Sequence, residues 1–210
     1  EVMCVEIIPI VVGALETNSY ILHDDRGNAA IIDPGADPEI ILSKVIDKSL
    51  QVDHIILTHG HFDHIGGVAA IKEKTGAKIA IHREDEEMLR DSYKNLSYAM
   101  GTDYRLEGAD RILEEGDTIE IGKHELYVFH TPGHTKGGIC LLLKDVAIFT
   151  GDTLFMYSIG RTDFYGGDHN TLIKSIKEKI MPLDDNLIVY SGHGPASTVG
   201  DERLGNPYIK

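Results

Sequence analysis

The sequence has little cysteine, few basic side chains relative to acidic ones, and no long apolar run. Its two cysteines, Cys4 and Cys140, lie far apart in apolar stretches, where cysteine usually packs as a small buried side chain. A disulfide framework and a catalytic thiol are therefore not expected, and the cysteine usage fits a cytoplasmic location. No stretch reaches the ~18 to 20 consecutive apolar residues of a membrane span, so no membrane partner is expected.

The charge balance excludes a further class of partner. Lys and Arg number 20 against 34 Asp and Glu, which gives a net charge of −14. Such a surface repels phosphate backbones, so a nucleic-acid partner is not expected. The 42% hydrophobic and 26% charged fractions are those of a globular protein, and one domain over residues 1–210 is the default for this length.

Strand-like and helix-like segments alternate along the chain. Short runs rich in β-branched or aromatic residues predict strands at 4–10, 19–23, 29–32, 54–57, 118–121, 126–129, 139–143, 146–149 and 187–190. Helical spacing of apolar residues predicts helices from Asp37, as N-cap, to about Ser49, and over residues 65–75 and 171–180. Strands followed by a helix occur in both halves, which predicts an α/β fold with two central sheets and outer helices, a four-layered αββα sandwich.

The strongest functional signal is the segment His59-Gly60-His61-Phe62-Asp63-His64. It follows a predicted strand directly and precedes a helix, a position where ligand sites gather in layered α/β folds. Four ligand-type side chains on a loop can converge on one point, and neutral imidazole with carboxylate suits zinc, manganese or iron. Asp63 alone has a simpler interpretation, as the N-cap of the following helix.

Three more polar residues occur in glycine-rich turns after apolar strands. They are His134 in TPGHT, Asp152 in TGDT and His193 in SGHGP. Glycine beside such a residue permits unusual backbone angles and a close approach to an ion, although each turn alone is also an ordinary turn. These three residues are candidate ligands for the same site.

Together the segments THGHFDH, TPGHT, TGDTLF and SGHGP resemble the metallo-β-lactamase superfamily, and within it the glyoxalase II-like hydrolases. The resemblance implies a single αββα domain with two metal ions at one edge of the sheets. It implies that His59, His61 and His134 hold one ion, that Asp63, His64 and His193 hold the other, and that Asp152 bridges them. Two divalent ions, with zinc favoured over iron or manganese, would share a hydroxide that attacks a small thioester. Asp63 and Asp152 are then the expected catalytic carboxylates.

The resemblance also bears on the substrate. Asp152 stands where the most familiar β-lactamases carry cysteine, which argues against a β-lactam. Arg161 falls where glyoxalase II has a basic substrate-binding residue, and it is predicted either to hold a substrate carboxylate or to form a structural salt bridge. Asp163 replaces an expected tyrosine, and the printed sequence ends at Lys210 without the helical domain that helps to hold glutathione. A small thioester is expected, with glutathione recognition in doubt.

Two other functions compete with thioester hydrolysis. The stretch Gly160-Arg161-Thr162-Asp163-Phe164 is similar to persulfide dioxygenases of the same superfamily, which hold one iron through the equivalents of His59, His134 and Asp152. A non-catalytic metal-binding protein is the third possibility, although structural zinc sites are normally closed by four ligands.

Two groups outside the motifs receive no functional assignment. The acidic run at residues 84–87 is predicted to be a solvated helix face. Histidines in polar or turn contexts are expected to be exposed, namely His23, His82, His124 and His169.

Overall fold

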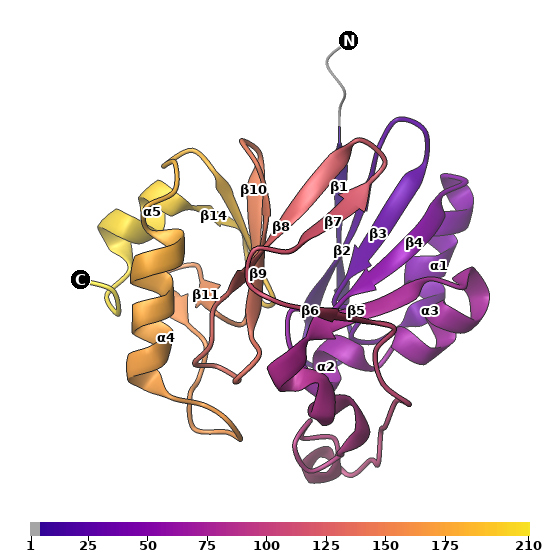
Figure 1. Ribbon diagram of the computed structural model, residues 1–210, viewed down its shortest axis with the longest axis horizontal. Helices are drawn as coiled ribbons and strands as arrows, with labels where there is room; N and C mark the ends of the chain where they lie inside the picture. Colours follow the sequence, from indigo (N-terminus) through magenta and orange to yellow (C-terminus); the bar gives the residue numbers. More distant parts are fainter. Residues whose placement is uncertain (1–4) are drawn as a thin grey trace.

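The computed structural model describes residues 5–210 and contains two six-stranded sheets packed face to face (Figure 1). In sheet order, the first consists of β1 (Glu6–Val12), β2 (Thr17–His23), β3 (Asn28–Ile32), β4 (Gln51–Ile56), β5 (Lys78–His82) and β6 (Arg111–Leu113). The second consists of β14 (Ser197–Thr198), β13 (Ile188–Ser191), β10 (Ala147–Gly151), β9 (Ile139–Leu143), β8 (His124–His130) and β7 (Thr118–Ile121). From β3 to β6 the first sheet is parallel, so the carboxyl ends of these strands share one edge.

Helices cover the outer face of each sheet. The first sheet is covered by α1 (Pro38–Asp47) and α3 (Val68–Thr75), and the second by α4 (His169–Ser175) and α5 (Val199–Gly205) (Figure 1). The π-helical turn η3 (Ile176–Ile180) continues α4. Shorter elements are α2 (Phe62–Ile65), the 3₁₀ helices η1 (Arg83–Arg90) and η2 (Tyr98–Met100), and the hairpin of β11 (Leu154–Phe155) and β12 (Ser158–Ile159). The predicted αββα sandwich is confirmed.

The buried apolar residues form three clusters that correspond to the three interfaces between layers. Ile31 and Ile55 point from the first sheet toward Ile41 and Ile71 on its helices. Between the sheets, alternate strand positions of both contribute to one cluster, and Phe149 is its largest fully buried member. On the far side of the second sheet, a third cluster includes Leu172 and Ile176. Side chains that alternate along each strand thus pack against both neighbouring layers.

The predicted elements differ from the observed ones mainly where glycines break a helix and where the observed elements are short. The helix predicted over residues 65–75 is broken at Gly66 and Gly67, because the chain there passes against residues 34–36; the amide of Gly67 donates to the carbonyl of Pro34 at 2.8 Å. Short β5, β6 and β14 and helix α5 were not predicted. Asp37 does occupy the N-cap of α1, but its carboxylate accepts from the amide of Gly13 at 2.8 Å rather than capping the helix.

Two further expectations concern the role of the cysteines and membrane-spanning segments. Cys140 is fully buried and unpaired, and burial raises the pKa of its thiol to about 11, so it is a structural side chain. Cys4 lies outside the described residues. None of the helices in residues 5–210 combines the length and apolar character that crossing a membrane requires.

Candidate metal centre

Loops from both sheets bring the predicted ligands together at one edge of the sandwich. The first sheet contributes His59 and His61 from the loop after β4, and Asp63 and His64 from the single turn of α2 that follows. The second contributes His134 after β8, Asp152 directly after β10 and His193 after β13. His61 occupies the N-cap of α2, so the simpler interpretation of Asp63 as that cap is wrong.

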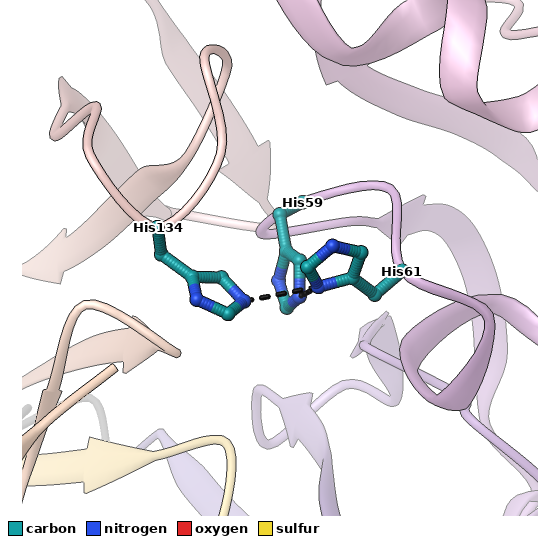
Figure 2. Close-up of side chains that lie close together, drawn as sticks. All are labelled: His59, His61 and His134. Carbon is teal, nitrogen blue, oxygen red and sulfur yellow. Dashed lines mark hydrogen bonds between the residues drawn. The ribbon is translucent and has the colours of Figure 1, made fainter. Parts of the chain in front are cut away.

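Three imidazoles converge in the first half of the site (Figure 2). The Nε2 atom of His59 and the Nε2 atom of His134 lie 3.1 and 3.0 Å from Nδ1 of His61. All three residues are at most 4% exposed. Burial lowers the pKa of His61 to about 3, and burial together with the neighbouring imidazoles places the pKa of His59 well below its usual value. Neutral imidazoles whose ring nitrogens face one another form a donor set suited to a borderline-soft divalent cation.

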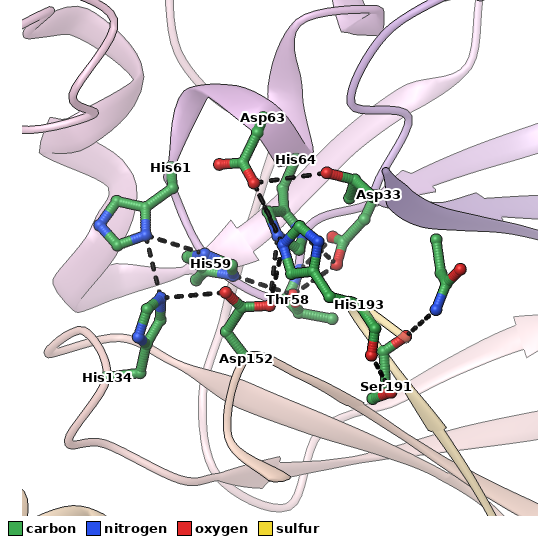
Figure 3. A network of polar contacts seen from close by, with 12 residues as sticks. Asp33, Thr58, His59, His61, Asp63, His64, His134, Asp152, Ser191 and His193 are labelled. Carbon is green, nitrogen blue, oxygen red and sulfur yellow. Dashed lines mark hydrogen bonds and ion pairs between the residues drawn. The ribbon is translucent and has the colours of Figure 1, made fainter. Parts of the chain in front are cut away.

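A second group lies beside the first, and Asp152 stands between them (Figure 3). The Nε2 atoms of His193 and His64 lie 3.2 and 3.5 Å from Oδ2 of Asp63. Asp152 directs Oδ2 toward Nε2 of His134 at 3.5 Å and Oδ1 toward Nε2 of His64 at 3.3 Å. Burial opposes ionisation of Asp152, but His64 and His134 outweigh it and hold the pKa of this carboxyl well below its usual range. One ionised carboxylate oxygen therefore faces each group.

Hydrogen bonds behind the site fix the orientation of the histidine rings. Nδ1 of His134 lies 2.7 Å from the carbonyl of Arg161, Nδ1 of His193 lies 3.0 Å from that of Leu15, and Nδ1 of His64 lies 2.9 Å from Oδ2 of Asp33. An N–H at each Nδ1 donates outward, which leaves the Nε2 lone pair aimed into the site. His64 Nε2 and Asp152 Oδ1 are buried and make no hydrogen bond within the described residues. Buried polar atoms of this kind fit an ion as their partner.

Glycine makes the close approach of these loops possible at two points. A side chain at Gly192 would collide with the carboxylate of Asp152 and the ring of His64. Gly151 has a φ of +49° and lies against the side chain of Thr58, which sets the direction of the following Asp152. Both positions agree with the expectation that glycine beside a ligand permits close approach.

Two buried aspartates that position the site were missed by sequence reasoning. Asp33 accepts from the amide of Thr58 at 2.7 Å and from its hydroxyl at 2.5 Å, as well as from His64. The Oγ1 atom of Thr58 lies 3.1 Å from Nδ1 of His59, so Asp33 supports a ligand in each group. Its sequence signal was available, since Asp33 follows an apolar strand just as Asp152 does.

Asp85 joins the two loops that carry the three converging imidazoles. Its carboxylate accepts from the amide of Gly60 at 3.1 Å, from the hydroxyl of Thr135 at 2.7 Å and from the amide of Gly137 at 2.6 Å. Asp85 is fully buried, so the prediction of a solvated acidic face is wrong at this position, although Glu84 and Glu87 are exposed. His82, expected to be exposed, is also buried and stacks on His130 with ring centroids 3.9 Å apart.

We expect Asp85→Asn to weaken metal binding by about 10- to 100-fold, as is common for groups that orient ligands. The amide would place an N–H against a backbone N–H that now donates to a carboxylate oxygen. Competition with a chromophoric chelator measures the affinity, and Glu84→Gln, an exposed neighbour on η1, is the matched control. An unchanged affinity in a folded Asp85→Asn protein would contradict a positioning role.

The converging groups line one side of a cavity of about 550 Å³. Arg161 also lines it, but its guanidinium is bound to Asp163 by hydrogen bonds of 2.8 and 2.7 Å and stacks on Phe164 at 3.9 Å from the ring centroid. The predicted salt bridge of Arg161 is present, and its contact with a substrate carboxylate stays a prediction. A substrate carboxylate would have to compete with Asp163 for this arginine.

Comparison with known proteins shows which family this chain resembles. The family model described as the metallo-beta-lactamase superfamily matches residues 12–193. The hydroxyacylglutathione hydrolase GloC of Haemophilus influenzae is 36% identical, over 99% of this chain and 98% of its own length.

Three solved structures are also similar. BLEG-1, described as a B3 metallo-beta-lactamase, has a TM-score of 0.94 at 39% identity over 98% of this chain and all of its own. TTHA1623 in a di-iron-bound form has a TM-score of 0.86 at 33% identity, covering 96% and 99% of the two chains. ETHE1 from Myxococcus xanthus has a TM-score of 0.81 at 28% identity, covering 96% and 83%.

One of these structures, at 39% identity, is described as a B3 metallo-beta-lactamase, and the expectation against a β-lactam substrate stays a prediction. The family match covers more than half of the chain and agrees with the observed fold and the clustered histidines and aspartates. This chain therefore belongs to the metallo-β-lactamase superfamily.

Proposed function

We propose that residues 1–210 form one hydrolase domain that binds two divalent metal ions and cleaves small thioesters. The observation that carries the proposal is the pair of ligand clusters, His59, His61 and His134 beside Asp63, His64 and His193, with Asp152 between them. Structural metal sites are normally closed by four protein ligands, whereas seven ligands shared by two ions leave positions for water and substrate. Zinc is the proposed metal, with iron and manganese as alternatives.

The chemistry divides between the ions and the chain. Two divalent ions, when bound, supply a hydroxide at neutral pH and polarise the thioester carbonyl. In the reaction, the oxygen of water adds to the acyl carbon and the carbon–sulfur bond breaks. The products are a thiol, a carboxylate and one released proton. Among the chain's own groups, Asp63 is the one proposed to accept that proton, because it lines the cavity. Its Oδ2 lies 3.2 Å from Nε2 of His193 and accepts from the hydroxyl of Thr17 at 3.3 Å.

The direct test combines metal analysis with turnover. Protein purified without oxygen should contain about two ions per chain, and zinc-loaded protein should hydrolyse lactoylglutathione or a simpler thioester. A β-lactam assayed in parallel shows whether the site also accepts the substrate class named for BLEG-1. A chain that stably holds one ion and cleaves no thioester would disprove the proposal.

A mononuclear iron dioxygenase is the second candidate, because Arg161 and Phe164 of the GRTDF stretch line the cavity and ETHE1 is among the similar structures. The complete second cluster of Asp63, His64 and His193 favours the hydrolase, since a facial triad needs no such group. Oxygen uptake by iron-loaded protein with glutathione persulfide separates the two functions. Sustained uptake would favour the dioxygenase, and its absence the hydrolase.

A further inference from the structure

The wall of the cavity opposite the metal centre is unusually poor in charge. Of the fifteen residues that line it, five belong to the proposed metal centre, and eight of the other ten are apolar. The apolar wall includes Leu15, Leu96, Met100, Phe155 and Phe164. Leu15 and Met100 are 46% and 57% exposed, so this surface faces solvent and is not simply part of the core. Apolar side chains gathered around a few polar groups are typical of a site for an apolar ligand.

The same wall offers little to an anionic substrate. All of its lining residues fall within the described part of the chain, and Arg161 is the only Lys or Arg among them. That guanidinium is already held by both carboxylate oxygens of Asp163. The net charge of −14 further repels anions that approach from solution. Glutathione carries two carboxylates, and beyond the metal centre the cavity has no free cation to hold either of them.

We propose that this cavity selects an uncharged thioester with an apolar acyl chain rather than a glutathione thioester. The inference rests on the proposed hydrolase function and specifies its substrate class. The acyl chain would be removed from water by the apolar wall, while the carbonyl lies at the metal centre. Binding strength would then increase with acyl length and depend little on the charge of the thiol part.

Matched substrates test this selectivity on the zinc-loaded chain. The hexanoyl group can be presented on neutral N-acetylcysteamine or on glutathione, and the acetyl thioester of N-acetylcysteamine measures the contribution of chain length. We expect kcat/KM to be about tenfold or more higher for the neutral hexanoyl thioester than for either of the others. Added salt should narrow the gap to the glutathione thioester, because it screens the repulsion.

A pair of variants tests whether the apolar wall of the cavity determines this substrate selectivity. Met100→Lys places a cation on the apolar wall, whereas Tyr98→Lys adds the same charge to the same 3₁₀ helix outside the cavity lining. Both residues are more than half exposed, so neither change buries a charge. Met100→Lys should raise the ratio of glutathione to neutral thioester turnover about tenfold, while Tyr98→Lys leaves the ratio within about twofold of its original value.

The outcomes separate this inference from the function on which it rests. Preference for the glutathione thioester, or equal turnover of the neutral and anionic hexanoyl thioesters, overturns the substrate inference and leaves the hydrolase intact. An equal shift by both lysine variants overturns the role of the wall. Failure of metal-loaded protein to cleave any of the thioesters overturns the proposed function, and the substrate inference with it.

Discussion

Replacing Asp152 by Asn should lower kcat/KM for thioester hydrolysis by on the order of 10³-fold, which corresponds to about 4 kcal/mol of transition-state stabilisation. Asp152 directs one carboxylate oxygen toward each ligand cluster. An amide has a single acceptor oxygen, so its NH₂ group would face either His134 or His64. The change keeps the shape of the side chain but removes its negative charge from between the two proposed ion sites.

Metal content and turnover must be measured together on the Asp152→Asn protein. We expect fewer than two tightly held ions as well as the loss of activity, because the bridging ligand and its charge are lost. Asp53→Asn is the control: Asp53 is an exposed carboxylate on β4, the strand that leads into the histidine segment. Full turnover with two bound ions in Asp152→Asn would be incompatible with the proposed bridge.

Removing the metal ions should abolish hydrolysis and lower the melting temperature by on the order of 10 °C for each ion lost. A ligand present at about 1,000 times its Kd stabilises the folded state by about 4 kcal/mol, and 1 kcal/mol shifts Tm by about 2 to 4 °C in a domain of this size. The structural reason is that the emptied site leaves ring nitrogens of His59, His61 and His134 facing one another within about 3 Å.

Calorimetry before and after dialysis against a chelator measures this effect, with elemental analysis to verify the loss of metal. Restoring zinc should restore both Tm and turnover. A variant that already lacks one ligand, His193→Ala, should lose less stability on chelation than the original chain. An unchanged Tm after complete removal of the metal would show that the centre contributes nothing to stability.

Sequence patterns selected histidines and aspartates that the structure brings together, because the local rule was simple. Each predicted ligand follows a strand within a turn, and turns after neighbouring strands meet at one edge of a sheet. The same rule applied to Asp33, but Pro34 and Gly35 gave that segment the character of an ordinary turn. Asp85 also lies just past the end of a strand, but that strand, β5, was not predicted, so the rule was not applied to it.

Two of the strands that were not predicted, β6 and β14, lie at the edges of the two sheets. β6 has three residues and β14 has two. Such short strands form because the neighbouring strand of the sheet offers them hydrogen-bond partners, not because their own sequences favour strands. The sequence also could not show whether Arg161 pairs with Asp163, because that depends on whether the carboxylate reaches the guanidinium in the fold.

The division of the proposed ligands between the two sheets affects the order of folding and metal binding. His59, His61, Asp63 and His64 are synthesised well before His193. Each of the two proposed clusters needs residues of both halves, because His134 completes one cluster and His193 the other. We therefore expect the proposed ions to bind only after the two halves have docked, and a bound ion then to oppose their separation.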